Sequence, residues 1–280
     1  MQQYYFLFAL AFIWTLFASI QDLRKREVAN WLNFSLIIFS LAYRAFYSLS
    51  IQDKNFFLFG LSGFAIFFVM ANILYYTRAF AGGDAKLLMG FGTILPYQSY
   101  SDLVSLSLLF IFLLFFIGAI YSLVYSVFIA TKNKKQFKKE FLKRFKKTRK
   151  LQMLSTIIFL LLLIAKPFYP FSIVFPIFFL IPIVYIYTKA LDKCMIKLYP
   201  PSKLTEGDWL ENSVKVHSHL IKKSVHGLSL EEIKLLRKYN KSVLIKEGIP
   251  FVPAFLIALI IMVCAFLVLQ ISPEFLFSLF

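Results

Sequence analysis

Long apolar stretches recur along the 280-residue chain and are separated by short polar segments. A spanning helix needs roughly 20 consecutive apolar residues, because each residue adds about 1.5 Å against a hydrocarbon core of about 30 Å. Most of the stretches meet or approach this length. They are Tyr4–Ile20, Trp31–Leu49, Phe56–Tyr76, Leu87–Leu95, Leu103–Ala130, Leu151–Ala165, Phe171–Thr188 and Ile249–Ile271. The pattern predicts an all-α, polytopic integral membrane protein with about eight transmembrane helices.

Three of the windows are less regular than the others. Leu87–Leu95 is short, and even with the flanking residues 84–96 it predicts only a partial or thinned crossing. Four prolines lie between the sixth and seventh windows or within the seventh, so that one of these two helices could be kinked or re-entrant. These are Pro167, Pro170, Pro176 and Pro182. Six or seven crossings therefore also fit the pattern.

The composition strengthens the membrane interpretation and excludes a disordered chain. Hydrophobic residues make up 60% of the chain and charged residues 16%, whereas soluble domains are about half apolar and about a quarter charged. The net charge is +17, but 11 of the 31 basic residues lie in 131–150 and 12 in 189–246. Basic residues that flank apolar windows orient helices and contact anionic lipids. We therefore expect membrane lipids, and no nucleic acid, as partners.

The distribution of basic residues also predicts the topology. If the loop with Arg24 is cytoplasmic, eight alternating crossings place Lys86 and the two basic segments on that side, and leave only Lys54 and Lys166 clearly opposite. This predicts a multi-pass protein of the cell membrane with both termini outside. The first window has no basic segment before it, so we expect it to be retained as a span.

The same pattern divides the chain into five parts. Residues 1–130 form a helical bundle of five windows, 131–150 a basic cytoplasmic loop, and 151–189 two membrane helices. Residues 190–246 form a soluble cytoplasmic insertion, and 247–280 contain the last membrane helix with a proline-containing start. The basic loop carries phenylalanines at helical spacing, so it is either solvated or lies on anionic headgroups. In the insertion, Ser229 and Glu232 predict a capping box at the start of a helix.

Candidate chemistry rests on two acidic residues, because ionisable groups beside a membrane are costly and tend to be functional. Asp22 ends the first window and Asp84 opens the fourth, so the topology places both at the cytoplasmic boundary. Two close carboxylates that share a proton can activate a water and polarise a carbonyl, as in an aspartic hydrolase. Two structural alternatives are open: Asp84 caps a helix, and Asp22 is a solvated acid among basic residues.

Three motifs resemble those of one family. The segment from Gln21-Asp22-Leu23-Arg24 through Val28 to Asn30-Trp31-Leu32 resembles the "D-x-R-x-x-x-I-P-N" segment of the type IV prepilin and archaeal preflagellin peptidases, which are GxGD-type aspartic membrane proteases. Residues 81–88 (AGGDAKLL) are similar to their "G-G-D-x-K-L" motif, and residues 248–255 (GIPFVPAF) to the "P-F-x-P-F-L" segment that opens their last helix. The motifs occur in the expected order.

The resemblance implies a peptidase that removes the basic leader peptide from prepilin or prearchaellin precursors at the cytoplasmic face of the membrane. It also implies a mechanism without a metal or other cofactor. Asp22 and Asp84 would be the catalytic dyad. The residues expected to support catalysis or bind the substrate are Gly82, Gly83, Lys86, Pro250, Phe251 and Pro253.

The chain departs from the family pattern at two positions. Ala29 stands where the pattern has proline, and Ala81 replaces the first glycine of a strict GxGD. The loop after Asp22 is short and lacks the cysteines of the bifunctional bacterial members, so methyl transfer is not expected. The hydrophilic segment 203–210 resembles the archaeal branch.

Two further interpretations follow from the residues. A transporter or an assembly component of a pilus or archaellum would use the same acids to bind ions or relay protons. In the insertion, Glu206, Asp208 and Glu211 cluster around Trp209, and we expect this acidic segment either to hold a basic leader or to form a solvated turn.

Overall fold

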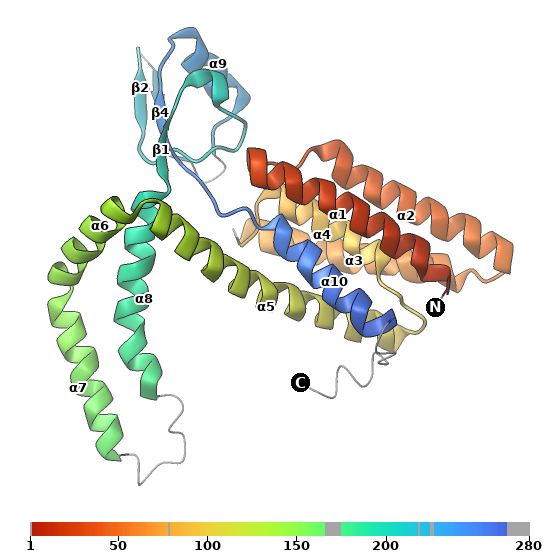
Figure 1. Ribbon diagram of the computed structural model, residues 1–280. Coiled ribbons are helices and arrows are strands. Elements are labelled where there is room, and N and C mark those ends of the chain that lie inside the picture. The colour runs from red at the N-terminus through yellow and green to blue at the C-terminus, as the bar shows by residue number, and fades with distance from the viewer. Residues whose placement is uncertain (1, 78, 166–174, 218, 225–226, 268–280) are drawn as a thin grey trace. The chain divides into compact units, whose positions relative to one another are not determined.

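The computed structural model describes the chain except for residues 1, 78, 166–174, 218, 225–226 and 268–280 (Figure 1). The chain divides into two compact units. The first consists of Met1–Leu123 together with Ile249–Phe280, and the second of Val124–Gly248. The last apolar window therefore returns to the unit that contains the N-terminus.

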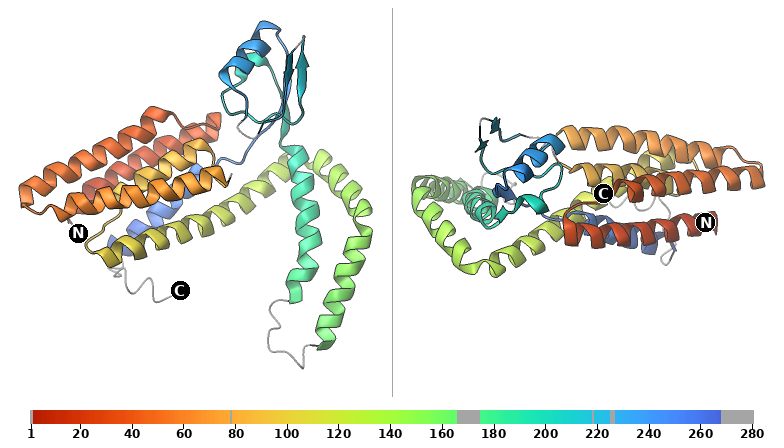
Figure 2. Two further views of the ribbon diagram at one scale, coloured as in Figure 1. Left: turned by 180° about the vertical axis from the view of Figure 1, so that it is seen from behind. Right: turned by 90° about the horizontal axis from the view of Figure 1, so that it is seen from above.

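Helices alone build the described part of the first unit. A 3-10 turn, η1 (Gln2–Tyr4), leads into α1, and the chain continues through a helical bundle. Its helices are α1 (Tyr5–Lys25), α2 (Asn30–Ile51), α3 (Asn55–Tyr76), α4 (Gly82–Ile94), the first part of α5 (Tyr100–Lys132) and α10 (Val252–Leu267). Helix α1 packs against α10, and α4 packs against both α2 and α3 (Figures 1 and 2).

This arrangement confirms a polytopic, helical membrane protein. Among the described residues, four helices are long and apolar enough to span a bilayer: α1 with its preceding turn, α2, α3 and α5. They carry large apolar side chains on the outside of the bundle, as lipid-facing helices do. Helix α4 has only 13 residues, as expected from the short fourth window. The two sides of the membrane, and the count of eight crossings, stay predictions.

Helix α4 is held unusually close to α3. A Cβ atom added to Gly63 of α3 would collide with the carbonyl oxygen of Gly92 in α4, and the reverse holds for Gly92. Small residues at a helix interface let two backbones approach, which is a common basis of helix association in membranes. The glycine pair therefore fixes the separation of the two helices.

A buried arginine completes the support of α4. Arg44 of α2 has no exposed surface, and its guanidinium donates three hydrogen bonds of 2.7–2.8 Å to backbone carbonyl oxygens. Two acceptors, Thr93 and Leu95, lie at the end of α4, and the third is Phe56 in α3. Since the last carbonyls of a helix lack partners within the helix, Arg44 serves as a cap supplied by a neighbouring helix.

The second unit contains a helical part and a small α/β part. After the end of α5 come α6 (Lys134–Lys147), α7 (Arg149–Ala165) and α8 (Phe175–Cys194). Helices α7 and α8 lie side by side, and α6 packs on α8 (Figures 1 and 2). The prolines of the sixth and seventh windows have different outcomes: Pro182 lies inside α8, while Pro167 and Pro170 lie outside the described residues.

The α/β part corresponds to the predicted insertion. It contains β1 (Ile196–Tyr199), η4 (Pro201–Lys203), β2 (Val214–Val216), β3 (His219–Ile221), α9 (Leu230–Lys238) and β4 (Val243–Lys246). Strand β1 pairs antiparallel with β4, and β2 with β3. Helix α9 starts at the predicted capping box, because Ser229 Oγ accepts the Glu232 N–H and the Glu232 carboxylate accepts the Ser229 N–H.

Candidate active site

Asp22 lies in the last turn of α1 and is buried. The helix ends at Lys25, and the next residue, Arg26, has a left-handed backbone (φ 61°). The N–H of Arg26 donates to the carbonyl oxygen of Asp22 at 2.9 Å. The side chain points elsewhere. Its Oδ2 accepts the backbone N–H of Val252, the first residue of α10, at 3.0 Å. The prediction that Asp22 is a solvated acid is therefore wrong.

The proline-containing segment before α10 explains how this contact forms. Pro253 lies in the first turn of α10, where its missing N–H has no partner to lose, and Pro250 is buried just before the helix. The N–H groups at a helix start lack intrahelical partners and attract anions. That of Val252 donates to the Asp22 carboxylate. The structure thus brings Pro250, Phe251 and Pro253 next to Asp22.

Asp84 is the third residue of α4 and is only partly exposed. Its Oδ2 accepts the N–H of Ala81, the residue that precedes the helix, at 3.4 Å. This hydrogen bond is the second half of a capping box, in which the third residue of a helix accepts the N–H of the residue before the helix. Asp84 therefore helps to cap α4, but from within the helix and not as the residue that precedes it.

The helices that carry the two aspartates are in contact. Helix α1, which ends just after Asp22, packs against α4, which begins just before Asp84. The turn between α1 and α2 also approaches α4, since a Cβ built on Gly83 would lie 3.5 Å from that of Val28. The arrangement therefore places Asp22 and Asp84 at the same end of the bundle, and their action as a catalytic dyad stays a prediction.

The two glycines before Asp84 are not required by backbone strain. Neither Gly82 nor Gly83 has a positive φ. A methyl group on either would meet its described neighbours, Tyr75 and Val28 respectively, at ordinary contact distances of 3.5–3.8 Å. The backbone conformation at these two positions therefore does not explain why they are glycines. Close approach of a substrate backbone stays a prediction.

Lys86 links α4 to α2. Its Nζ donates to Oδ1 of Asn30 at 2.7 Å and lies 5.9 Å from the centre of the Phe34 ring. Within the described residues Lys86 forms no ion pair with Asp84. The side chain of Lys86 is therefore directed to α2, and its contact with a substrate stays a prediction.

Sequence reasoning missed a second asparagine in the site. Asn33 is fully buried, and its Nδ2 donates to the carbonyl oxygen of Gly83 at 3.4 Å, while its Oδ1 has no partner among the described residues. A signal was available: Asn33, Ser40 and Arg44 recur at helical spacing within an apolar window. Polar residues on the buried face of a membrane helix indicate internal contacts.

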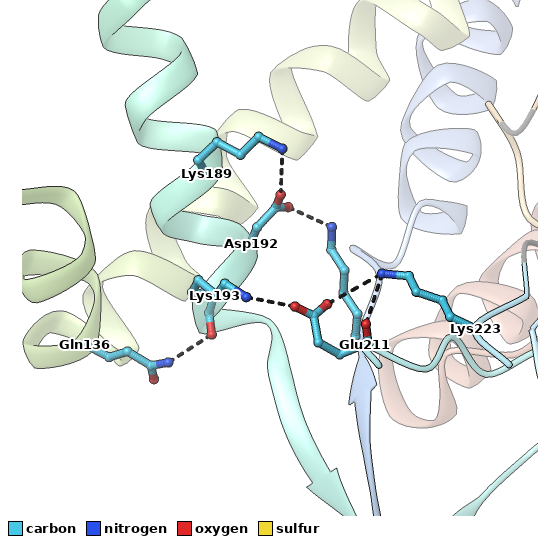
Figure 3. Close-up of polar contacts among 7 residues, drawn as sticks. Gln136, Lys189, Asp192, Lys193, Glu211 and Lys223 are labelled. Atoms are coloured by element: carbon cyan, nitrogen blue, oxygen red, sulfur yellow. Dashed lines mark hydrogen bonds and ion pairs between the residues drawn. The ribbon is translucent and has the colours of Figure 1, made fainter. Parts of the chain in front are cut away.

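The acidic segment of the second unit is already engaged (Figure 3). The Glu211 carboxylate accepts a hydrogen bond from Lys193 Nζ at 2.8 Å, and its other oxygen lies 3.9 Å from Lys223 Nζ. The hydrogen bond from Lys193 lowers the pKa of Glu211. Asp208 Oδ2 accepts the N–H of Thr205 at 2.8 Å, and partial burial raises the pKa of Asp208. The structure therefore favours a structured turn over a cluster of three acids open to a basic leader.

Comparison with known proteins matches residues 9–123 to the type IV leader peptidase family, and this range includes both aspartates. Three curated relatives are preflagellin peptidases. That of Methanococcus maripaludis is 29% identical over 119 residues, which is 40% of this chain and 51% of the relative. That of Methanococcus voltae is 28% identical over 134 residues (45% and 57%), and that of Methanocaldococcus jannaschii 33% over 89 residues (32% and 38%).

The chain thus spans about half the length of these curated relatives, or less. No solved structure matches. The match to the type IV leader peptidase family covers less than half of the chain, and the third motif, at residues 248–255, lies outside the matched range.

Proposed function

We propose that this membrane protein is an aspartic endopeptidase that removes the basic leader peptide from prearchaellin-like or type IV prepilin-like precursors. Its relatives are named preflagellin peptidases, which supports the coarser statement that it is a protease acting on leader peptides. The observation that carries the finer proposal is the position of Asp22 and Asp84 at the same end of the bundle, with Asp22 hydrogen-bonded to the start of α10.

The proposed reaction uses both carboxylates without a metal. One carboxylate takes a proton from a water molecule as the water oxygen attacks the carbonyl carbon of the scissile bond. The other, protonated, donates a hydrogen bond to the carbonyl oxygen as negative charge develops there. The tetrahedral intermediate then breaks its C–N bond, and the departing amine takes a proton from the dyad. The single proton that the pair shares at the start is restored.

The held carboxylate of Asp22 fits this chemistry. The backbone N–H of Val252 at the start of α10 fixes its orientation before substrate binds, which is the preorganisation that catalytic charges need. Asp84, which is partly exposed, lies on the open side of the pair. The irregular backbone at residues 249–251, just before α10, is a candidate edge along which an extended substrate could pair as an added strand.

We place the dyad at the cytoplasmic face of the cell membrane, on the distribution of basic residues. Arg24 and Lys25 lie in the last turn of α1, two and three residues after Asp22. A basic leader would approach from that side, and the apolar helix of the precursor would stay in the bilayer.

The test is cleavage of a purified precursor by the full chain in proteoliposomes. Asp22→Asn and Asp84→Asn should each lower kcat by at least about 100-fold, because neither acid can replace the protonation state of the other. Asp53→Asn is the matched control, since Asp53 is an exposed acid of the same unit that caps the N–H of Asn55 at the start of α3.

The control should cleave like the wild type. Retention of more than a few per cent of wild-type activity in either dyad variant would remove that residue from the mechanism. If both variants are active, the proposal of an aspartic peptidase fails, and an ion-binding role of the same acids becomes the better explanation.

A further inference from the structure

Helix α6 is strongly basic and amphipathic. Its 14 residues, KKQFKKEFLKRFKK, include eight lysines and arginines and a single acid, Glu140. Phe137, Phe141 and Phe145 recur every four residues, with neighbouring ring centres 5.8 and 6.2 Å apart, so they form one stripe. Such a helix is typical of segments that lie at the surface of a membrane, with basic side chains at anionic headgroups and apolar side chains toward the acyl chains.

Within the described part of the second unit, contacts cover one end of the stripe and leave the other end exposed. Phe137 packs edge-on against Tyr187 of α8 at 5.5 Å, and Gln136 donates to the carbonyl oxygen of Lys193 at 2.9 Å (Figure 3). At the other end, Leu142 and Phe145 are nearly half exposed. Helix α6 is therefore fixed to α8 at its start and open at its end.

The open end leads directly into an apolar helix. Helix α7 begins two residues after α6, and beyond Lys150 it is almost entirely apolar, with Met153 and Ile157 more than half exposed. The change from basic to apolar residues across this junction matches the change from headgroups to acyl chains in a bilayer.

A pocket of about 660 Å³ lies at this junction. Lys146 and Arg149 line its basic part, and Phe145, Met153 and Ile157 line its apolar part. Arg149 and Ile157 are eight residues apart on one helix, so the pocket walls extend about 12 Å along α7. The pocket therefore combines a cationic end with an apolar trough.

The cations of the pocket lack protein partners. Among the described residues, neither Lys146 nor Arg149 forms an ion pair or hydrogen bond through its side chain. The other polar groups of the wall are occupied, because Gln152 donates to Phe145 O and Thr148 Oγ1, and Thr156 donates to Gln152 O. An anion that enters the pocket would thus be held by Lys146 and Arg149.

We propose that this pocket is a binding site for an anionic phospholipid, with the phosphate at Lys146 and Arg149 and an acyl chain against Met153 and Ile157. The charge and the apolar wall together select this occupant. A free phosphate ion would use only the cationic end, and a nucleic acid would leave the apolar wall exposed. The site is independent of the proposed peptidase dyad, which lies in the other unit.

The experiment measures lipid retention by native mass spectrometry on the full chain, purified in detergent with added phosphatidylglycerol or phosphatidylcholine. The wild type should retain phosphatidylglycerol in preference. The variant Lys146→Gln/Arg149→Gln should lose roughly 30-fold in affinity for it, since each basic residue near a headgroup contributes about a factor of five.

The matched control is Lys134→Gln/Lys135→Gln, which removes the same charge from the start of the same helix, outside the pocket. It should bind phosphatidylglycerol within about threefold of the wild type. Equal losses in the two double variants would overturn the proposal, because attraction to the helix as a whole would then explain binding. Equal retention of both lipids by the wild type would overturn it too.

Two further arms separate a lipid from a phosphate ion. Inorganic phosphate at a large excess should not displace the bound phosphatidylglycerol, and Ile157→Ser should weaken its binding. If phosphate displaces the lipid and Ile157→Ser binds it like the wild type, the pocket recognises the ion alone and the proposed lipid site is wrong. Circular dichroism of each variant checks that the helices are intact.

Discussion

The contact between Asp22 and the start of α10 can be tested by removing one donor and leaving the side chain of the aspartate in place. Val252→Pro deletes the N–H that donates to Asp22 Oδ2 at 3.0 Å. Val252 is the first residue of α10, a position at which proline is favoured because its φ suits a helix start. The variant should therefore keep the helix and lose the hydrogen bond.

The magnitude follows from the kind of bond that is lost. A hydrogen bond to a charged group contributes about 1.5–3 kcal/mol, and here the acceptor is a buried carboxylate. If the bond orients Asp22 for catalysis, kcat should fall by a factor of about 10 to 150, since about 1.4 kcal/mol corresponds to tenfold. KM should change little, because the donor does not contact the substrate in the proposed reaction.

Val252→Ala is the matched control, because it keeps the N–H and removes only buried methyl groups. It should lower the free energy of unfolding by about 1–2 kcal/mol and leave kcat within about threefold of the wild type. Both variants are assayed on a purified precursor in proteoliposomes. Equal kcat values for Val252→Pro and Val252→Ala would refute the reasoning, since the hydrogen bond would then not matter for catalysis.

Two further predictions concern α4. Gly83→Ala should fold like the wild type, because the added methyl group meets Val28 at an ordinary contact distance. A raised KM for the precursor would show that the substrate backbone approaches Gly83, and unchanged kinetics would exclude this approach. Arg44→Met should lower the thermal stability by an amount equivalent to about 3 kcal/mol, measured by thermal unfolding in detergent, because it removes three buried hydrogen bonds to backbone carbonyl oxygens; an unchanged Tm would contradict the capping role.

The transmembrane helices were predictable from the sequence because their signal is local. The windows Trp31–Leu49 and Phe56–Tyr76 differ by at most two residues at either end from α2 and α3. The short strands of the second unit were missed for the opposite reason. Strands β2 and β3 have three residues each, too few for an alternating pattern to be recognised.

The candidate site was predictable in its residues and not in its contacts. The motifs identified Asp22, Asp84 and the segment at Pro250 independently. That Asp22 accepts the N–H of Val252, 230 residues away, depends on the return of the last helix to the first, which no local pattern contains. Likewise, a lysine two residues after Asp84 suggested a direct charge interaction, whereas the helix directs Lys86 to Asn30 of α2.

The shortness of α4 and the burial of Arg44 explain each other. At about 1.5 Å per residue, 13 residues extend about 20 Å, less than the hydrocarbon thickness of about 30 Å. With Asp84 at the membrane boundary, as we propose, α4 would end within the apolar layer, where free carbonyl groups are costly. The charge of Arg44 lies at that end, where the helix dipole is negative, and its donors take the Thr93 and Leu95 carbonyls. We therefore infer that the position of Asp84 at one end of α4 depends on Arg44 at the other.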